Sequence, residues 1–211
     1  MQLEKERELI VEYGKKMLET GLTRGTGGNL SLYNRKAGLV AISPSGMDYK
    51  RITPRDVVLI DTDGQVREGE RKPSTEHLMH LIFYSRSEEI GAIFHTHSPF
   101  ACSVAALNQS IPAASYLMGF CGVEVPCAEY ALFASPELAE NAYRAMGENR
   151  AVLLANHGVL AVGEDLDQAF TTAEMVEFSA EIYCRAKSMG EPVIIPPAEM
   201  ERNIRRFEAH S

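Results

Sequence analysis

The sequence lacks the cysteine pattern of a disulfide-stabilised protein. Its four cysteines are scattered over 211 residues without a C-x-x-C pair: Cys102, Cys121, Cys127 and Cys184. This spacing disfavours a disulfide framework and favours the free thiols of a cytoplasmic protein. Cys121 and Cys127 are close enough to be an alternative pair of metal ligands, but the histidines described below form a better set.

Basic blocks and long apolar segments are also missing. The net charge is −8, the pI is near 5.3, and no stripe of lysine and arginine occurs. We therefore expect no nucleic-acid partner, and an anionic substrate would have to be captured by local groups instead of the overall field. No apolar stretch approaches the length that crosses a bilayer, and the first residues predict an amphipathic helix instead of a secretory signal. We therefore expect no membrane partner either.

The remaining composition is that of an ordinary globular protein. Hydrophobic residues make up 45% of the chain and charged residues 24%, which is enough apolar material for a core. No internal repeat, low-complexity tract or linker rich in proline, glycine and serine divides the sequence. A length of 211 residues fits one domain, so we predict a single domain over residues 1–211.

Apolar periodicity predicts helices and strands in irregular alternation. The turn residues Asn34-Arg35-Lys36 separate two strand-like runs, which predicts a hairpin. A hairpin together with strands that alternate with helices predicts an α/β fold with a mixed sheet. The expected helices are 3–20, 74–86, 99–107, 135–146, 165–188 and 198–208, with one short turn after Thr53-Pro54; the expected strands are 30–33, 38–43, 57–60, 90–96 and 151–155.

Two histidines at the end of one strand carry the strongest functional signal. His95 and His97 close the apolar run 90–94, and they project to the same side because side chains of a strand alternate faces. His157 follows the run 151–155, which we expect to lie beside the first strand, and Glu76 opens a helix. Three imidazole nitrogens and a carboxylate oxygen suit zinc or another divalent transition metal. The alternative is a pair of strand-end histidines bonded to backbone carbonyls.

The other histidines are weaker candidates. His80 lies one turn beyond Glu76, so we expect the two side chains to touch, and a supporting role fits His80 better than ligation. His210 stands at the C-terminal end, where we expect an exposed side chain instead of a catalytic one.

Three small-residue turns form a candidate anion site: Gly27-Gly28-Asn29, Ser45-Gly46 and Ser74-Thr75. They are rich in backbone N–H and hydroxyl donors. Ser74-Thr75 also lies where a helix is expected to begin, and the free amides and dipole of a helix N-terminus favour phosphate. Each turn alone has a structural explanation, because glycines form turns and serine and threonine cap helices. A common phosphate site requires a fold that brings the three together.

These motifs, taken in order, resemble those of the class II aldolase and adducin-head family, most closely its members that act on L-fuculose 1-phosphate. The resemblance runs nearly from end to end. It rests on Gly21-Leu22, Gly25-Thr26-Gly27-Gly28-Asn29, Ser45-Gly46, Pro73-Ser74-Thr75-Glu76, His95-Thr96-His97, Ile111-Pro112, Pro126 and Asn156-His157-Gly158.

The resemblance implies a three-layer α/β/α domain around a mixed, largely antiparallel sheet. It also implies a homotetramer with the active site at a subunit interface and one Zn²⁺ per subunit. The implied roles are metal ligation by Glu76, His95, His97 and His157; catalysis by Glu76 as acid/base and by Tyr116 as the neighbouring subunit's proton donor; and binding of the substrate phosphate by Gly28, Asn29, Ser45, Gly46, Ser74 and Thr75.

The implied activity is a zinc-dependent, reversible cleavage of a ketose 1-phosphate, of the L-fuculose 1-phosphate type, into dihydroxyacetone phosphate and a small aldehyde such as L-lactaldehyde. Other reactions of the family on sugar phosphates remain alternatives: 4-epimerisation of a ribulose phosphate, dehydration and decarboxylation. A non-enzymatic scaffold like the adducin head is a remote alternative, because scaffold relatives lose the metal histidines that this chain keeps.

The chain departs from the family pattern at its C-terminal end. The aldolases carry a tyrosine in a tail that closes over the site, whereas the stretch 206–211 offers His210. This departure leaves the preferred aldehyde and the stereochemistry open. The 4-epimerases have an aspartate near 114–117, and its absence here disfavours epimerisation.

Overall fold

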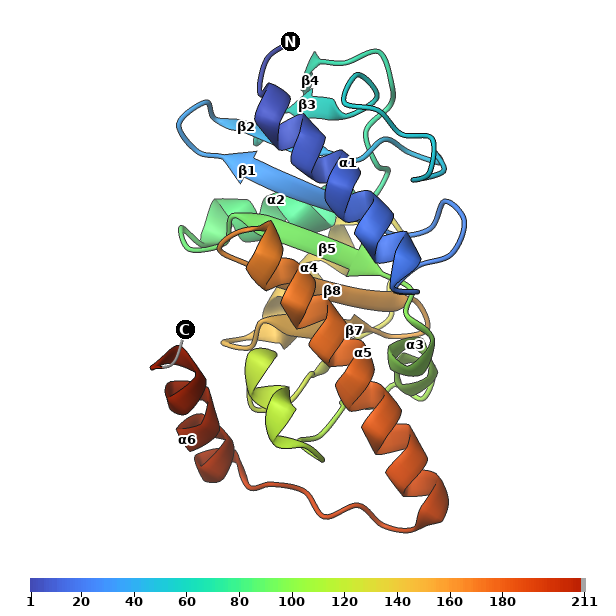
Figure 1. The fold of residues 1–211 in the computed structure, drawn as a ribbon, viewed down its shortest axis with the longest axis vertical. Coiled ribbons are helices and arrows are strands. Elements are labelled where there is room, and N and C mark those ends of the chain that lie inside the picture. The colour runs from blue at the N-terminus through green and yellow to red at the C-terminus, as the bar shows by residue number, and fades with distance from the viewer. Residues whose placement is uncertain (210–211) are drawn as a thin grey trace.

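The computed structural model describes residues 1–209, which form an eight-stranded sheet covered by helices (Figure 1). The helices are α1 Glu4–Glu19, α2 His77–Arg86, α3 Pro99–Ala105, α4 Pro136–Met146, α5 Leu166–Met189 and α6 Pro197–Glu208, with the 3-10 helix η1 Tyr116–Phe120. The strands are β1 Asn29–Asn34, β2 Leu39–Ile42, β3 Val58–Ile60, β4 Val66–Glu68, β5 Ala92–Thr96, β6 Cys127–Ala128, β7 Ala151–Leu154 and β8 Gly158–Gly163.

The strand order is β4-β3-β2-β1-β5-β8-β7-β6. Every neighbouring pair is antiparallel except β6 and β7, so the expected mixed, largely antiparallel sheet is confirmed. In the registers on either side of β5, Asn29 lies opposite His95, and Thr96 lies opposite Val159. The start of β1, the end of β5 and the start of β8 therefore share one edge of the sheet.

Alternating side chains of the strands feed two separate cores, one on each face of the sheet. Phe94 packs in the core under α1 and α5, whereas its neighbour Ile93 packs in the core under α2 and α4. Figure 1 shows α1 and α5 in front of the sheet, with α2 and α4 behind it. This arrangement confirms the three layers.

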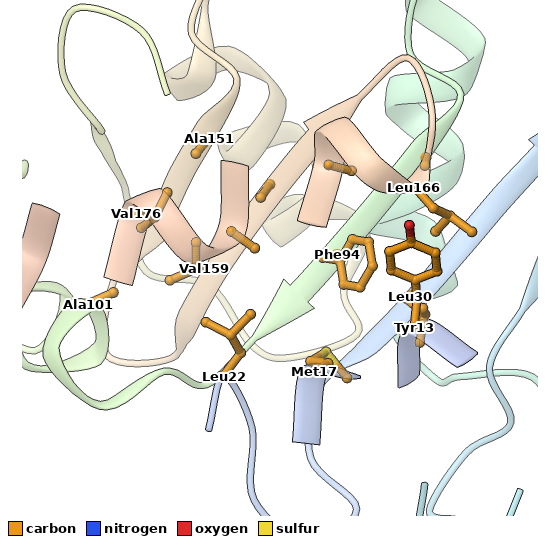
Figure 2. Packing of buried hydrophobic residues seen from close by; sticks show 14 of the residues in the cluster. Tyr13, Met17, Leu22, Leu30, Phe94, Ala101, Ala151, Val159, Leu166 and Val176 are labelled. Carbon is orange, nitrogen blue, oxygen red and sulfur yellow. The ribbon is translucent and has the colours of Figure 1, made fainter. Parts of the chain in front are cut away.

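The core under α1 and α5 supports the strands next to the histidines. Figure 2 shows Phe94 with Tyr13 and Leu30 between the sheet and α1. Phe94 also packs edge-on against Phe170 of α5, with ring centroids 5.6 Å apart. Full burial of one such side chain contributes about 1.5–3 kcal/mol. Because Phe94 precedes His95 directly, this packing fixes the backbone that carries the first imidazole.

Helix starts are fixed by side chains that satisfy free backbone amides. Ser135 Oγ accepts from the Leu138 N–H at 3.1 Å at the start of α4, as its Ser-Pro-Glu sequence predicts. At the start of α3, Glu177 of α5 accepts from the N–H groups of Phe100 and Ala101, both at 2.9 Å. Each such cap contributes about 1 kcal/mol. The Glu177 cap fixes the segment that follows His97.

Two expectations about the elements are wrong. β8 and β6 were not predicted, and β8 lies between β5 and β7, so the run 151–155 is not the neighbour of the histidine strand. Helix α2 begins at His77 and not at 74, because Ser74 pairs with Ser43 in extended backbone. The expected short turn after Thr53-Pro54 is present at 54–56, where Asp56 accepts from both the N–H and the hydroxyl of Thr53.

The four cysteines are free thiols, as expected. Cys121 is buried on the α5 side, where its Sγ lies 3.8 Å from the Thr172 carbonyl, and burial raises its pKa to about 12. This environment does not favour the alternative metal site, because a thiol must ionise to bind zinc. Within residues 1–209, no helix has the length and apolar character needed to cross a membrane. His210 lies outside the described residues.

Candidate metal centre

Three segments that are distant in sequence meet at the shared edge of the sheet. His95 is on β5, His97 follows that strand directly, and Glu76 is the residue before α2. His157 lies in the turn between β7 and β8, where Asn156 has a left-handed backbone with φ of 55°. This turn reverses the chain at the edge where β5 ends. His157 therefore reaches the other two histidines although β7 itself is one strand removed.

The three imidazoles and the carboxylate form one compact cluster. One ring nitrogen each from His95, His97 and His157 lies within 4.8 Å of the others. The Nε2 atoms of His95 and His97 are 3.0 Å apart. Glu76 lies between two of the rings, with Oε2 3.3 Å from His95 Nε2 and Oε1 3.2 Å from His157 Nε2. The structure thus brings all four predicted ligands together.

Backbone groups fix the orientation of the first imidazole. His95 Nδ1 lies 2.9 Å from the Val159 carbonyl, which can only accept, so Nδ1 carries the proton and Nε2 faces the cluster. Gly28 and Gly158 make this packing possible. A Cβ at Gly28 would lie 2.6 Å from the His95 carbonyl oxygen, and one at Gly158 would lie 2.8 Å from His97 Cδ2. These two glycines let the backbone approach the cluster closely.

The surroundings hold His97 and Glu76 in the protonation states that bind a cation. Burial, followed by the neighbouring His95 and His157, lowers the pKa of His97 to about 4. Burial alone would raise the pKa of Glu76, but the short contacts of its carboxylate with the His157 and His95 imidazoles outweigh burial and hold that pKa far below its usual range. At neutral pH His97 is therefore neutral and Glu76 is ionised, as metal binding requires.

The cluster fits a metal ion by its own chemistry. Glu76 Oε1 is buried and accepts no well-directed hydrogen bond from the described residues, which is costly for a charged oxygen. The Nε2 atoms of His95 and His97 lie 3.0 Å apart, so at most one of the two can carry a proton. Three nitrogens and one carboxylate oxygen match the donor set of zinc and related divalent ions. A cation among them would satisfy the orphaned oxygen and the converging lone pairs.

The three predicted anion turns also lie together. Pro44 and Pro73 form a bridge, Ser74 N donates to the Ser43 carbonyl at 3.1 Å, and Ser45 N donates to the Lys72 carbonyl at 3.0 Å. Tyr49 joins the third turn to these two, because its hydroxyl is 3.1 Å from the Gly28 carbonyl and 3.4 Å from Ser43 Oγ. Ser45, Gly46 and Thr75 are exposed, whereas Ser74 is buried. The fold therefore meets the condition for a common site.

Asn29 has a role that the sequence did not indicate. Its side chain is buried, with Nδ2 donating to Glu76 Oε2 at 3.0 Å and Oδ1 lying 2.6 Å from His80 Nε2. The expected direct contact between Glu76 and His80 is wrong, because Asn29 stands between them. His80 continues to Ser31 Oγ and Tyr84, which sequence reasoning also missed. Two spacings were the available signal: Ser31 is two residues after Asn29 on a strand, and Tyr84 is four residues after His80 on a helix.

Tyr116 lies at the start of η1 and is 54% exposed. Among the described residues its aromatic partner is Phe207 of α6, with ring centroids 6.0 Å apart. Its assignment as a proton donor stays a prediction, since that role would require a neighbouring subunit.

Comparison with known proteins assigns the family. Residues 8–184 match the Class II Aldolase and Adducin N-terminal domain. The chain is 53% identical to a 5-deoxy-D-ribulose 1-phosphate aldolase of Bacillus thuringiensis serovar kurstaki, over 100% of this chain and 99% of that protein. It is 32% identical to the L-fuculose phosphate aldolase of Escherichia coli K12, covering 95% and 93%. A solved L-fuculose 1-phosphate aldolase superposes with a TM-score of 0.95 at 48% identity, covering 97% and 96%.

The chain belongs to the class II aldolase and adducin family. Within it the protein is classed with the aldehyde-lyases that act on sugar phosphates, because these aldolases match it over nearly their whole length. The expected family and fold are confirmed.

Proposed function

We propose that this protein is a zinc-dependent aldolase that reversibly cleaves a ketose 1-phosphate into dihydroxyacetone phosphate and a small aldehyde. The convergence of His95, His97, His157 and Glu76 at one buried point is the observation that carries the proposal. A bound zinc ion would supply Lewis-acid stabilisation of the negative charge that develops on the ketose oxygens when the carbon–carbon bond breaks.

The chain's own residues would hold the substrate and move its protons. The turns containing Gly28, Ser45-Gly46 and Ser74-Thr75 offer backbone and hydroxyl donors to the phosphate. Glu76 would return a proton to the carbon that becomes the hydroxymethyl group of dihydroxyacetone phosphate. Tyr116 of a neighbouring subunit would exchange the proton on the aldehyde oxygen. Asn29, first assigned to the phosphate, directs its side chain to Glu76 and retains one amide hydrogen for the substrate.

The first substrate to consider is 5-deoxyribulose 1-phosphate, with L-fuculose 1-phosphate as the second. The 53% relative is named for the first sugar, and the 48% identical solved structure for the second. Cleavage of the first would release acetaldehyde, and cleavage of the second would release lactaldehyde, so the two differ only in the aldehyde. The part of the site that receives the aldehyde would therefore select between the two sugars.

A coupled assay for dihydroxyacetone phosphate tests the activity. It should be run with fuculose, rhamnulose, ribulose and 5-deoxyribulose 1-phosphates, on protein purified without chelator and analysed for metal. We expect stoichiometric zinc and triose phosphate release, fastest from 5-deoxyribulose 1-phosphate. Epimerised, dehydrated or decarboxylated products without triose phosphate would assign another reaction of the family. Protein that neither contains nor takes up zinc would support the scaffold alternative.

The quaternary structure forms part of the same proposal. A homotetramer with one zinc per subunit would let Tyr116 serve a neighbouring subunit, which agrees with its exposure. Light scattering on the purified protein tests this assembly, and a monomer with full activity would contradict it. We also propose a cytoplasmic location, which fits the free thiols.

A further inference from the structure

A buried chain of hydrogen bonds runs from the α2 side of the sheet to the candidate acid/base. Tyr84 OH lies 2.6 Å from Ser31 Oγ, which lies 2.7 Å from His80 Nδ1. His80 Nε2 lies 2.6 Å from Asn29 Oδ1, and Asn29 Nδ2 lies 3.0 Å from Glu76 Oε2. All five residues are buried. No part of the proposed function accounts for Tyr84, Ser31 and His80.

The direction of every hydrogen bond in this chain follows from its last acceptor. The ionised Glu76 can only accept, so the Asn29 amide must turn its NH₂ toward Glu76 and its oxygen toward His80. His80 Nε2 must then carry a proton. Burial lowers the pKa of His80 to about 3, so the ring is neutral and its Nδ1 accepts from the Ser31 hydroxyl. Because the Ser31 proton goes to His80, Tyr84 donates to Ser31 Oγ and shares its one proton with the Ser31 carbonyl oxygen, which lies 3.1 Å away.

The Asn29 contact gains importance once the histidines hold a cation. The contacts of the Glu76 carboxylate are Asn29, His95 and His157. The two histidine contacts use Nε2 atoms that point into the candidate metal centre. A bound cation would take up these nitrogens and face Glu76 Oε1, and the Asn29 amide would be the remaining described side chain that holds Oε2. The helix start adds no restraint, since the Glu76 side chain makes no cap hydrogen bond.

We propose that His80, supported by Ser31 and Tyr84, is a positioning residue that fixes the Asn29 amide and thereby aims the Glu76 carboxylate at the reacting carbon. This inference rests on the proposed function, because it assigns Glu76 as the acid/base. Without the His80 N–H, the Asn29 oxygen loses its donor and the amide is held only at its Glu76 end. The amide can then shift or rotate away from the position that aims the carboxylate.

The central experiment compares His80→Leu with His80→Gln. The leucine cannot donate to Asn29, whereas the glutamine amide can donate and also accept from Ser31. We expect His80→Leu to lower kcat about 10- to 100-fold, the range for leaving a buried acceptor, here Asn29 Oδ1, without its donor, with KM and zinc content within about twofold of wild type. His80→Gln should recover most of the loss.

Met79→Ala is the matched control for disturbance of α2. Met79 is adjacent to His80, equally buried, and packs in the apolar core between α2 and the sheet. We expect it to lower Tm while leaving kcat unchanged. If His80→Leu folds poorly, Ser31→Ala is the milder second variant. It should lower kcat about 3- to 10-fold. Equal kcat losses in Met79→Ala and His80→Leu at equal loss of Tm would overturn the positioning role.

Nitrogen NMR of His80 gives a readout that is independent of turnover. We expect the neutral Nε2–H form at pH 7, in the presence and absence of zinc; an Nδ1–H form or a charged ring would overturn the proposal. Combining His80→Leu with Asn29→Ala should give a kcat loss well below the product of the single losses, and full multiplicativity would also overturn it. An inactive wild-type protein would refute the proposed function, whereas an active wild type with unchanged His80→Leu turnover would refute this inference alone.

Discussion

Gly158→Ala should weaken zinc binding although Gly158 is not a ligand. An added Cβ would lie 2.5 Å from the Thr96 carbonyl oxygen, 2.8 Å from His97 Cδ2 and 3.1 Å from His95 Cε1. The backbone of Gly158 does not require glycine, because its φ is outside the left-handed region. The substitution therefore acts only through the space that the methyl group takes, at the point where β5 and β8 meet.

The displacement can be worked out from these contacts. Ordinary contact begins at 3.4 Å, so the methyl group and the Thr96 oxygen must separate by about 0.9 Å (3.4 − 2.5). Thr96 is held opposite Val159 in the ladder, so the strands must shift together with His95 and His97. Metal–ligand distances tolerate about 0.2 Å. We expect zinc affinity to fall about 10- to 100-fold and the metal-free protein to lose about 1–3 kcal/mol of stability.

The assay is zinc competition against a chromophoric chelator, with denaturant unfolding of the metal-free protein. Gly190→Ala is the matched control, because a Cβ at Gly190 meets nothing within 4 Å and its φ of 167° is extended backbone. We expect wild-type zinc affinity in that variant. If Gly158→Ala binds zinc as tightly as wild type, the sheet edge is more compliant than the contacts indicate, and the link between strand packing and ligand geometry is refuted.

Glu76→Gln should fold and retain some zinc but lose turnover, and normal activity would show that the acid/base lies elsewhere. Tyr116→Phe should impair cleavage more than zinc content; if both fall equally, the proton-donor role is wrong. A refolded mixture of these two variants should regain activity only if the site is shared between subunits. His80 should make the metal-free protein acid-sensitive: its pKa is about 3 when folded against 6.5, so the unfolded chain binds a proton first and stability falls as the pH falls below 6.5. Denaturant unfolding should show that wild type loses about 2 kcal/mol more than His80→Gln between pH 8 and pH 5, and equal losses would contradict this.

The local elements of the fold could be predicted, but their arrangement could not. The hairpin of β1 and β2 and the start of α4 at Ser135-Pro136 follow from turn and cap residues that act over a few positions. The run 158–163 is as apolar as the run before it, and nothing local shows that it pairs between β5 and β7. Strand order depends on burial of both faces of the sheet, which no single segment encodes.

Part of the candidate site could also be predicted from the sequence, and part could not. His95 and His97 share a face because of strand periodicity, so their proximity could be predicted. The use of Asn29 could not, because an asparagine after two glycines is equally suited to a turn, a phosphate contact or a side-chain bridge. Which one it adopts is decided by His80, which approaches from a helix that lies far along the chain.

Neighbouring groups position the ligand residues of this centre even in the protein alone, and this bears on how the metal and the fold are related. His95 is held by the Val159 carbonyl, Glu76 by Asn29, and His157 by a turn whose strands are paired in the sheet. The cores on both faces of the sheet consist of apolar residues. In small zinc domains the metal supplies the folding energy, because no comparable core exists. Here the apolar cores position the ligands without the free energy of metal binding. A bound ion can therefore be used for chemistry without being needed to build the site.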